Sequence, residues 1–267
     1  MNIAVIFLVA GMSSRFGGKI KSLTEVGPND ESLIEISVNQ AIKAGINKII
    51  FVVGEKTEKP FKEKFGEEYK GIPIEYTLQT YDHEKRDRPW GAMDSLCSAK
   101  DLIDSPFVVC NGDDLYGEEA FRILLNHIKE KNTIAVIGYK LGNFLSKEGG
   151  VNRGILKVDS ENLTDSIKEN FNITKENLKE KELSEDDLCN MGILTLNQKT
   201  LEELNKVLVK FKEDHANDRK VECLLTDELG KILKNNGEKM QVYETDAKCV
   251  GITNPGDEEK IKIELKK

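Results

Sequence analysis

The sequence predicts an α/β protein in which helices cover both faces of a mainly parallel sheet, giving a three-layer sandwich. Short apolar runs rich in Ile and Val alternate with amphipathic stretches of helical period through the first half of the chain. Strands that are separated by helices need crossover connections, and such connections produce parallel pairing. The chain has 267 residues, of which 39% are hydrophobic, so it can bury a sizeable core and is not a disordered chain.

The elements of the first half follow from these local patterns. Buried strands are expected where apolar residues run without interruption, and helices where apolar residues recur every three or four positions. The first helix is expected to end at Gly45. The expected strands are 3–10, 48–53, 74–78, 106–110 and 133–139. The expected helices between them are 33–44, 59–65, 91–103 and 118–129.

The second half of the chain is less regular. Two segments, 154–158 and 163–167, are typical of a strand pair around a turn at 159–162. The charged segment 175–187 is expected to be a solvated loop or helix. Neither an internal repeat nor a low-complexity linker interrupts the chain, so we expect a single domain over residues 1–267. Further strands are expected at 191–196 and 240–244, and further helices at 200–211, 222–235 and 258–267.

Charge and cysteine content exclude several classes of function. The formal net charge is −8 and the pI is about 5.2, which argues against binding to nucleic acids or anionic membranes. The five cysteines are scattered without C-x-x-C spacing, so neither a zinc site nor a disulfide framework is expected. The first apolar run is short and ends in a glycine-rich loop rather than a signal-cleavage site, and no run approaches the ~18 residues of a membrane span. We therefore expect a cytoplasmic protein.

The stretch that follows the first strand carries the strongest functional signal. Residues 10–18 are rich in glycine and small residues, and Arg15, Lys19 and Lys21 add three cations without an acid among them. Glycines let backbone amides converge on an anion, and the cations neutralise phosphate oxygens. A Walker loop is excluded because neither Ser nor Thr follows its Gly-Lys pair, and a dinucleotide loop because Phe16 stands at its third glycine position. We therefore expect a phosphate-binding loop.

Together with the first strand, this loop resembles that of the sugar-phosphate nucleotidyltransferases, or nucleotide-sugar pyrophosphorylases, in which L-x-A-G-x-x-[ST]-R precedes a lysine. The resemblance implies a Rossmann-like, glycosyltransferase-A-like nucleotidyltransferase fold with its site at the strand C-termini. It implies catalytic roles for Arg15, on the triphosphate, and Lys21, on the reacting phosphate. The common family pattern has a proline before that lysine, where this chain has Ile20, so Lys19 stays an alternative. The implied nucleotide-binding backbone is Ala10, Gly11, Met12, Ser13 and Ser14.

A second stretch that resembles the family begins at the end of the strand 74–78. There Gln79 precedes Pro89-Trp90-Gly91-Ala92, which opens a helix. In similar enzymes the glutamine and the glycine read the base and the ribose, which implies that Gln79, Pro89, Gly91 and Ala92 bind the nucleotide. An amide can donate to and accept from a base edge, and glycine lets the backbone approach a planar ring. Trp90 could cap this pocket or belong to the core.

A third stretch, Asn111-Gly112-Asp113-Asp114-Leu115-Tyr116, delivers two adjacent acids at a strand end. Mg²⁺ prefers one or two carboxylates together with phosphate oxygens and water. The resemblance implies that Asp113 is the metal ligand, and adjacent side chains of a strand point in opposite directions, so Asp114 is not equivalent to it. The family often supplies a second acid near the C-terminus, where this chain has Gly251, and Asp246 is the nearest candidate for it.

The same resemblance extends, more weakly, to an acceptor pocket, implied at Asn111, Gly154, Glu169 and Asn190. Residues 1–140 would then form the nucleotide-binding half, and residues 141–267 the acceptor-binding half with closing helices. The implied reaction transfers a nucleotidyl group from a nucleoside triphosphate to a phosphorylated acceptor, a sugar 1-phosphate, with Mg²⁺ and release of pyrophosphate. Neither a nucleic acid nor a membrane is an expected partner, and a homo-oligomer is possible.

Three other functions compete with this one. A cytidylyltransferase acting on a non-sugar phosphate or a phosphonate would share the loop and the acids, and the departures at Ile20 and Gly251 leave this alternative open. A catalytically weak nucleotide-sensing protein would keep the fold and lack a metal ligand. A Rossmann oxidoreductase is disfavoured because the dinucleotide glycine pattern is missing.

Overall fold

The computed structural model describes residues 1–11, 16–145, 149–252 and 256–266. Its helices are α1 (Leu33–Ala44), α2 (Glu58–Phe65), α3 (Ala92–Ser98), α4 (Gly117–Glu130), α5 (Gln198–Asp214), α6 (Leu225–Asn236) and α7 (Asp257–Leu265), with short 3-10 turns η2 (Lys21–Leu23), η3 (Lys100–Leu102) and η4 (Leu141–Phe144). Its main strands are β1 (Ala4–Leu8), β2 (Lys48–Val53), β4 (Ile72–Leu78), β5 (Phe107–Asn111), β7 (Ala135–Lys140), β8 (Val151–Leu156), β10 (Ile167–Ile173), β11 (Leu188–Leu196) and β12 (Met240–Glu244). The short strands are β3 (Glu68–Tyr69), β6 (Asp114–Leu115), β9 (Leu163–Thr164) and β13 (Val250–Gly251).

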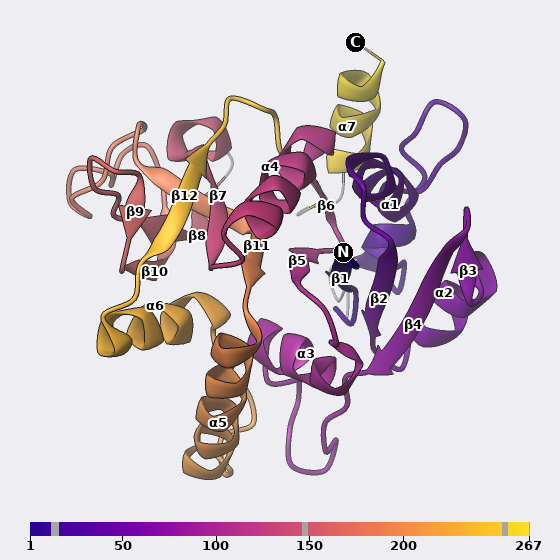
Figure 1. The fold of residues 1–267 in the computed structure, drawn as a ribbon, viewed down its shortest axis with the longest axis horizontal. Coiled ribbons are helices and arrows are strands. Elements are labelled where there is room, and N and C mark those ends of the chain that lie inside the picture. Colours follow the sequence, from indigo (N-terminus) through magenta and orange to yellow (C-terminus); the bar gives the residue numbers. More distant parts are fainter. Residues whose placement is uncertain (12–15, 146–148, 253–255, 267) are drawn as a thin grey trace.

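One sheet runs through both halves of the chain (Figure 1). Its order is β3-β4-β2-β1-β5-β11-β7-β12-β9, with β8 and β10 attached beside β11. The strands β4, β2, β1 and β5 are mutually parallel, as are β7 and β12, whereas β11 runs antiparallel to both of its neighbours β5 and β7. The predicted mainly parallel α/β sheet is thus confirmed for its central strands. Antiparallel pairs occur at β11, at the edge strands β3 and β9, and between β8 and β10.

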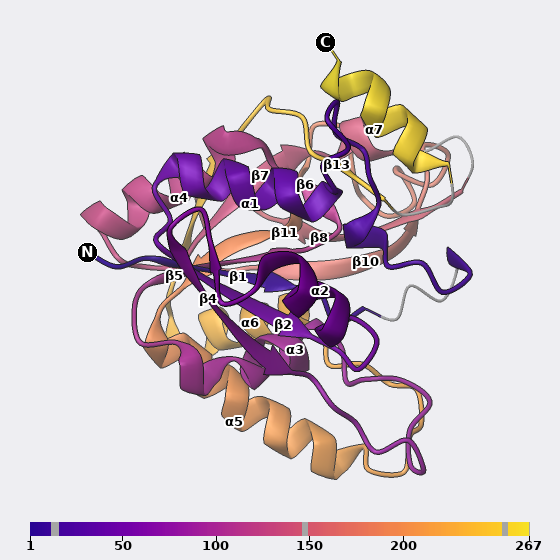
Figure 2. The same ribbon diagram turned by 90° about the vertical axis from the view of Figure 1, so that its right-hand side faces the viewer.

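Side chains that point alternately to the two faces of the central strands explain the three layers. In β1, Val5 and Phe7 face the core under α1, α2 and α4, while Ala4 and Ile6 face the core under α3, α5 and α6. Successive side chains of a strand point to opposite faces, so a strand that is apolar throughout must be covered on both sides. Figure 2 shows α1 and α4 on one side of the sheet, and α3, α5 and α6 on the other.

Local signals place the helix ends. The α1 helix begins after Ser32, whose backbone N–H donates to the Glu35 carboxylate at 2.9 Å, and it ends at Gly45 with φ of 110°. The helix expected at 91–103 stops at Ser98 and continues only as the turn η3, and the helix expected at 222–235 begins at Leu225. The expected helix boundaries therefore differ from the observed ones mainly at these termini.

The strand pair expected around the turn at 159–162 is present. The Asp159 N–H donates to the Leu163 carbonyl at 2.9 Å, and Leu156 of β8 pairs antiparallel with Ile167 of β10. The second strand differs in extent, because β10 continues to Ile173 and the separate short strand β9 pairs with β12. The strand β10 has the sequence Ile-Lys-Glu-Asn-Phe-Asn-Ile, in which polar residues interrupt the apolar pattern that marks a strand. The charged segment 175–187 is a loop rather than a helix.

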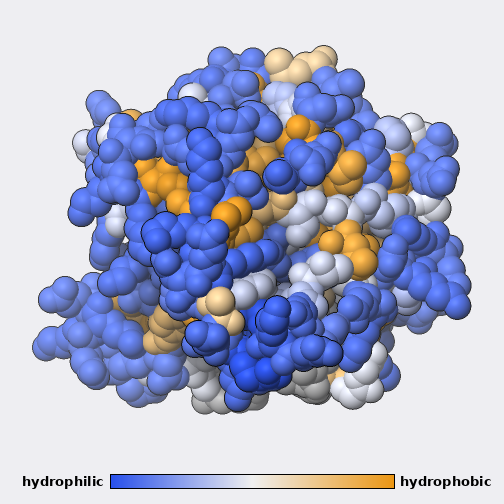
Figure 3. Space-filling model, turned by 90° about the horizontal axis from the view of Figure 1, so that it is seen from below, coloured by the Kyte–Doolittle hydropathy of each residue, from blue (hydrophilic) through white to orange (hydrophobic). Residues whose placement is uncertain are grey.

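The face that carries α3 and α5 is predominantly hydrophilic, with small separate hydrophobic areas (Figure 3). Large apolar side chains that are exposed, such as Val209 and Ile263, are scattered through the described part of the chain. In that part no helix combines the length and the apolar character needed to cross a membrane.

Candidate active site

A cavity of about 440 Å³ opens at the carboxyl ends of the central parallel strands. Ligand sites of open α/β sheets lie at this edge. Of the residues predicted to bind nucleotide, acceptor or metal, nine line it: Ala10, Gly11, Lys21, Gln79, Pro89, Gly91, Ala92, Asn111 and Asp113. Met12, Ser13, Ser14 and Arg15 lie outside the described residues. The three stretches singled out in the sequence therefore meet at one cavity.

Parallel register explains why these distant residues meet. Leu8 at the end of β1 pairs with Val52 on one side and with Asn111 on the other, and Leu78 of β4 pairs with Val53. Beyond the sheet, the Gly112 N–H still donates to the Leu8 carbonyl at 3.1 Å. A Cβ at Gly112 would overlap the Val9 side chain, so this close approach of the two strand ends requires glycine.

Lys21 and Asp113 form the charged floor of the cavity. Lys21 begins η2, and its Nζ lies 3.7 Å from the Asp113 carboxylate and 4.9 Å from the centre of the Phe16 ring. The side chains of Lys21 and Asp113 are 20% and 40% exposed, so both can reach a ligand. Burial raises the pKa of Asp113, and the Lys21 ammonium opposes that shift. Lys19 is exposed and does not line the cavity, which favours Lys21 as the phosphate-binding cation.

Asp114 faces away from this cavity, as its place next to Asp113 in an extended segment predicts. Its carboxylate accepts hydrogen bonds from Asn111 Nδ2 at 3.2 Å and from the Tyr116 hydroxyl at 3.4 Å. Burial, reinforced by the negative charge of Asp113, raises the pKa of Asp114 to about 7. A Cβ at Gly251 would overlap the Asp114 carboxylate, so the two positions compete for one space.

The second predicted metal ligand lies elsewhere. Asp246 lines a separate cavity of about 680 Å³ together with Asp114, whereas Asp113 lines the first cavity. Within residues 1–11, 16–145, 149–252 and 256–266, no three His, Cys, Asp or Glu side chains come together as a metal site. Two carboxylates line the first cavity among the described residues: Asp113, beside Lys21, and Glu222, which is paired with Arg88.

The predicted acceptor residues form a row across three strands. Gly154 of β8 pairs with Glu169 of β10 on one side and with Asn190 of β11 on the other. The Glu169 carboxylate accepts from the Thr226 hydroxyl at 3.1 Å, and burial raises its pKa. None of these three lines the cavity that holds Asp113, whereas the fourth predicted acceptor residue, Asn111, does. The structure thus brings the row together, and the Asn111 side chain lies against Gly192, whose N–H donates to the Asn190 side chain at 2.8 Å.

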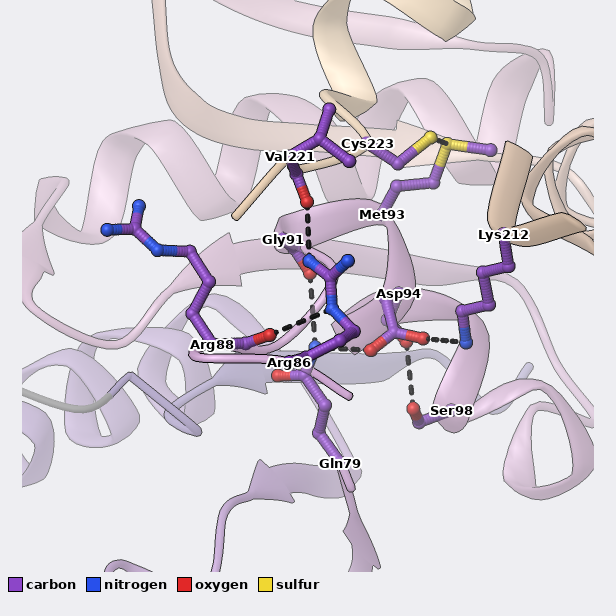
Figure 4. Close-up of polar contacts among 10 residues, drawn as sticks. All are labelled: Gln79, Arg86, Arg88, Gly91, Met93, Asp94, Ser98, Lys212, Val221 and Cys223. Carbon is purple, nitrogen blue, oxygen red and sulfur yellow. Dashed lines mark hydrogen bonds and ion pairs between the residues drawn. The ribbon is translucent and has the colours of Figure 1, made fainter. Parts of the chain in front are cut away.

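Sequence reasoning missed the charged residues that support and border the cavity. Arg88 and Glu222 both line it and form an ion pair of 2.9 Å. Behind the cavity, Asp94 of α3 joins Gln79 to Lys212 of α5 (Figure 4). Glu222 and Lys212 lie over 100 positions from their partners, and no local pattern marks such pairs.

Trp90 belongs to the core rather than to a cap over the pocket. It is 9% exposed, packs edge to face on Phe211, and does not line the cavity. The Arg86 guanidinium lies 3.3 Å from the centre of the Trp90 ring, and Arg86 is itself only 3% exposed. Its guanidinium donates to the Asp218 and Val221 carbonyls, so it links the segment before α3 to the segment before α6.

Comparisons with known proteins agree with this geometry. The fold matches that of a protein from Bacillus anthracis named as a candidate glucose-1-phosphate thymidylyltransferase, with a TM-score of 0.73, 14% identity, and coverage of 98% of this chain and 95% of that chain. It also matches a UDP-glucose pyrophosphorylase complexed with UDP-glucose, with a TM-score of 0.70, 16% identity, and coverage of 100% of this chain and 99% of that chain. A third match is a UDP-glucose pyrophosphorylase from Acinetobacter baumannii, with a TM-score of 0.68, 15% identity, and coverage of 99% of this chain and 93% of that chain.

Sequence comparison gives the family. No curated protein sequence matches the chain. The profile of the family described as "Nucleotidyl transferase" matches residues 18–239, which include Lys21, Gln79, Asp113 and the whole acceptor row. With this match over most of its length, and with the fold of sugar-phosphate nucleotidyltransferases, the chain belongs to the nucleotidyl transferase family.

Proposed function

We propose that the protein transfers a nucleotidyl group from a nucleoside triphosphate to a sugar 1-phosphate, giving a nucleotide-sugar and pyrophosphate. The observation that supports this most is the single cavity in which the phosphate-loop strand end, Lys21, Asp113 and the Gln79–Gly91 pair meet. The cation and the carboxylate suit a triphosphate, and the amide and glycine suit a base. A triphosphate-dependent transfer needs both in one place.

The proposed reaction requires little acid–base catalysis from the protein. The acceptor phosphate is already ionised, so its oxygen can attack the α-phosphorus while the bond to the β-phosphate oxygen breaks and pyrophosphate leaves. Catalysis then consists of positioning and charge neutralisation. Lys21 would neutralise the α-phosphate, and Arg15 would bind the departing pyrophosphate.

The chemistry of Asp113 suits Mg²⁺. This cation is commonly held by one or two carboxylates, with substrate phosphates and water completing its shell, and the 40% exposed Asp113 side chain offers one such ligand within the cavity. When bound there, Mg²⁺ would supply Lewis-acid polarisation of the phosphate. Asp246, from the separate cavity, would serve only if the segments around it moved, so we assign the protein's share of the site to Asp113.

The acceptor class is proposed from two considerations. The row Glu169–Gly154–Asn190 places a carboxylate and an amide beside a glycine, groups that suit sugar hydroxyls. The structures with the same fold are named for glucose 1-phosphate and UDP-glucose. Both considerations point to a sugar rather than to an amino-alcohol phosphate or a phosphonate.

A screen for pyrophosphate release tests the proposal. Five triphosphates (UTP, dTTP, CTP, ATP and GTP) would be combined with hexose 1-phosphates, choline phosphate and a phosphonate, with and without Mg²⁺. We expect Mg²⁺-dependent release with one base class and a hexose 1-phosphate. Release only with choline phosphate or the phosphonate would establish the non-sugar alternative, and triphosphate binding without release from any pair would establish the nucleotide-sensing one.

A further inference from the structure

We propose that Asp94 and Lys212 are positioning residues that fix the Gln79 amide with its carbonyl oxygen toward the nucleotide base. The site then takes a base whose ring nitrogen carries a hydrogen, as in uracil, thymine and guanine, over one with a bare ring nitrogen, as in cytosine and adenine. This inference rests on the proposed function, because it assumes that the base occupies the cavity beside Gln79.

The contacts around Gln79 define the direction of its amide. Gln79 Nε2 donates to Asp94 Oδ2 at 2.7 Å and to the Gly91 carbonyl at 3.1 Å (Figure 4). A carboxylate and a backbone carbonyl only accept hydrogen bonds, so both must meet the NH₂ group rather than the amide oxygen. The reverse orientation would set the amide oxygen against two acceptors.

Lys212 completes the arrangement from α5, which lies on the same face of the sheet as α3. Its Nζ pairs with Asp94 Oδ1, the oxygen that Gln79 does not use. The Asp94 side chain is 5% exposed and that of Lys212 is 36% exposed, so the ion pair is shielded on the carboxylate side. A carboxylate that is so deeply buried is costly without a partner of opposite charge, and Lys212 is that partner.

The consequence for the base follows from what is left on Gln79. Both hydrogens of its NH₂ group are used, and Gln79, itself 6% exposed, lines the cavity. Its oxygen Oε1 has no hydrogen-bond donor among the described residues, so it is the group that the amide offers to a ligand. Opposite this oxygen, the ring N–H of uracil, thymine or guanine gives a hydrogen bond. The bare ring nitrogen of cytosine or adenine at the same place sets two lone pairs face to face, and these bases must shift along their edge before an amino group can meet the oxygen.

Replacing Asp94 with asparagine should remove the bias on the direction of the amide. Lys212 can only donate, so it would hold the oxygen of Asn at position 94 and turn the new NH₂ group toward Gln79. That NH₂ group favours the Gln79 oxygen on its side, while the Gly91 carbonyl still favours the Gln79 NH₂ group, so the two orientations of the amide compete. Binding should shift from the ring N–H bases toward their bare-nitrogen counterparts.

The experiment is a direct binding titration of UTP, CTP, GTP and ATP at fixed Mg²⁺, which needs no acceptor. We expect the wild-type protein to prefer UTP over CTP or GTP over ATP, and Asp94→Asn to reduce that preference by at least ~10-fold, the worth of one hydrogen bond exchanged for a repulsion. The double variant Asp94→Asn with Lys212→Met removes both charges together and leaves the new amide free to accept from the Gln79 NH₂ group, so with the Gly91 carbonyl it should keep the wild-type preference. Lys210→Ala, on the same helix in an exposed pair with Asp214, is the matched control and should bind like the wild type.

The possible failures are distinguishable. A wild-type preference for CTP or ATP, or an Asp94→Asn variant with unchanged base preference, would overturn the inference and leave the proposed function standing. Equal weakening of all four triphosphates in both Asp94 variants would show that the pair is merely structural, which also overturns it. If the wild-type protein binds no triphosphate, the proposed function fails, and this inference fails with it.

Discussion

Lys21→Ala is the perturbation that probes the chemistry of the cavity most locally. Lys21 lies at the floor of the cavity with its ammonium 3.7 Å from Asp113, while Lys19, two positions earlier, is exposed and outside the cavity. The two residues share charge, size and neighbourhood in the chain. Lys19→Ala is therefore a matched control for loss of positive charge near the phosphate loop.

The expected magnitude follows from Coulomb's law. A unit cation about 4 Å from a phosphate charge contributes ~4 kcal/mol at the effective dielectric constant of ~20 that suits sites near a surface. Water that enters the space left by the side chain recovers part of this energy. About 3 kcal/mol of lost transition-state stabilisation corresponds to ~10²-fold in kcat. We expect Lys21→Ala to lower kcat by ~10² or more and Lys19→Ala to lower it by less than ~10-fold.

The assay is pyrophosphate release at saturating triphosphate and acceptor, so that lost binding is not mistaken for lost chemistry. Thermal unfolding should change little, because a partly exposed ion pair such as Lys21–Asp113 contributes under ~1 kcal/mol. If Lys19→Ala proved the more damaging variant, the phosphate-binding cation would be Lys19 and the reasoning from the cavity would be refuted.

Three further predictions concern the residues around the cavity. Asp113→Asn should lower Mg²⁺-dependent turnover by ~10² or more with an unchanged melting temperature, since an amide is a poor Mg²⁺ ligand; near-normal kcat would refute the metal assignment. Gly91→Ala forces a side chain onto a φ of 96° with its Cβ 3.0 Å from a carbonyl oxygen, so chemical denaturation should show a loss of ~1–3 kcal/mol. Gly71→Ala, at φ of 79° in open space, should cost less, and equal losses would contradict the steric argument. Because burial raises the pKa of Asp114 to about 7, the folded state holds its proton more tightly than the unfolded chain, so ionisation destabilises the fold as pH rises from about 4 to 7. Melting temperatures should therefore show Asp114→Asn gaining stability relative to wild type between pH 4 and pH 8, and a constant difference would refute the shift.

The part of the site that lies on parallel strands was predictable from the sequence. Ala10 and Gln79 follow strands and Asn111 ends one, and parallel register brings the ends of such strands to one edge. That inference needed neither the distances between these residues nor the identity of their hydrogen-bond partners. The sequence also favoured Lys21 through the family pattern, and its place in the cavity agrees with that preference.

The rest depended on contacts between segments with no shared local pattern. The strand β10 alternates irregularly and carries exposed polar residues, so apolar periodicity found only its first residue, Ile167, and missed the rest of the strand that pairs with β8. Asp94 and Lys212 are 118 positions apart, and each looks like an ordinary surface charge of an amphipathic helix. The overlap that a side chain at position 251 would have with Asp114 likewise follows only from the pairing of β13 with β6.

We propose that the nucleotidyl group passes from the triphosphate to the acceptor in the cavity that holds Lys21 and Asp113. The most direct measurement follows a triphosphate labelled at the α-phosphate, incubated with a hexose 1-phosphate and Mg²⁺. We expect the label to appear in a nucleotide-sugar, with one pyrophosphate released per transfer, and Lys21→Ala and Asp113→Asn each to abolish most of this transfer. Label that stays in the triphosphate, or that moves equally well in both variants, would contradict it.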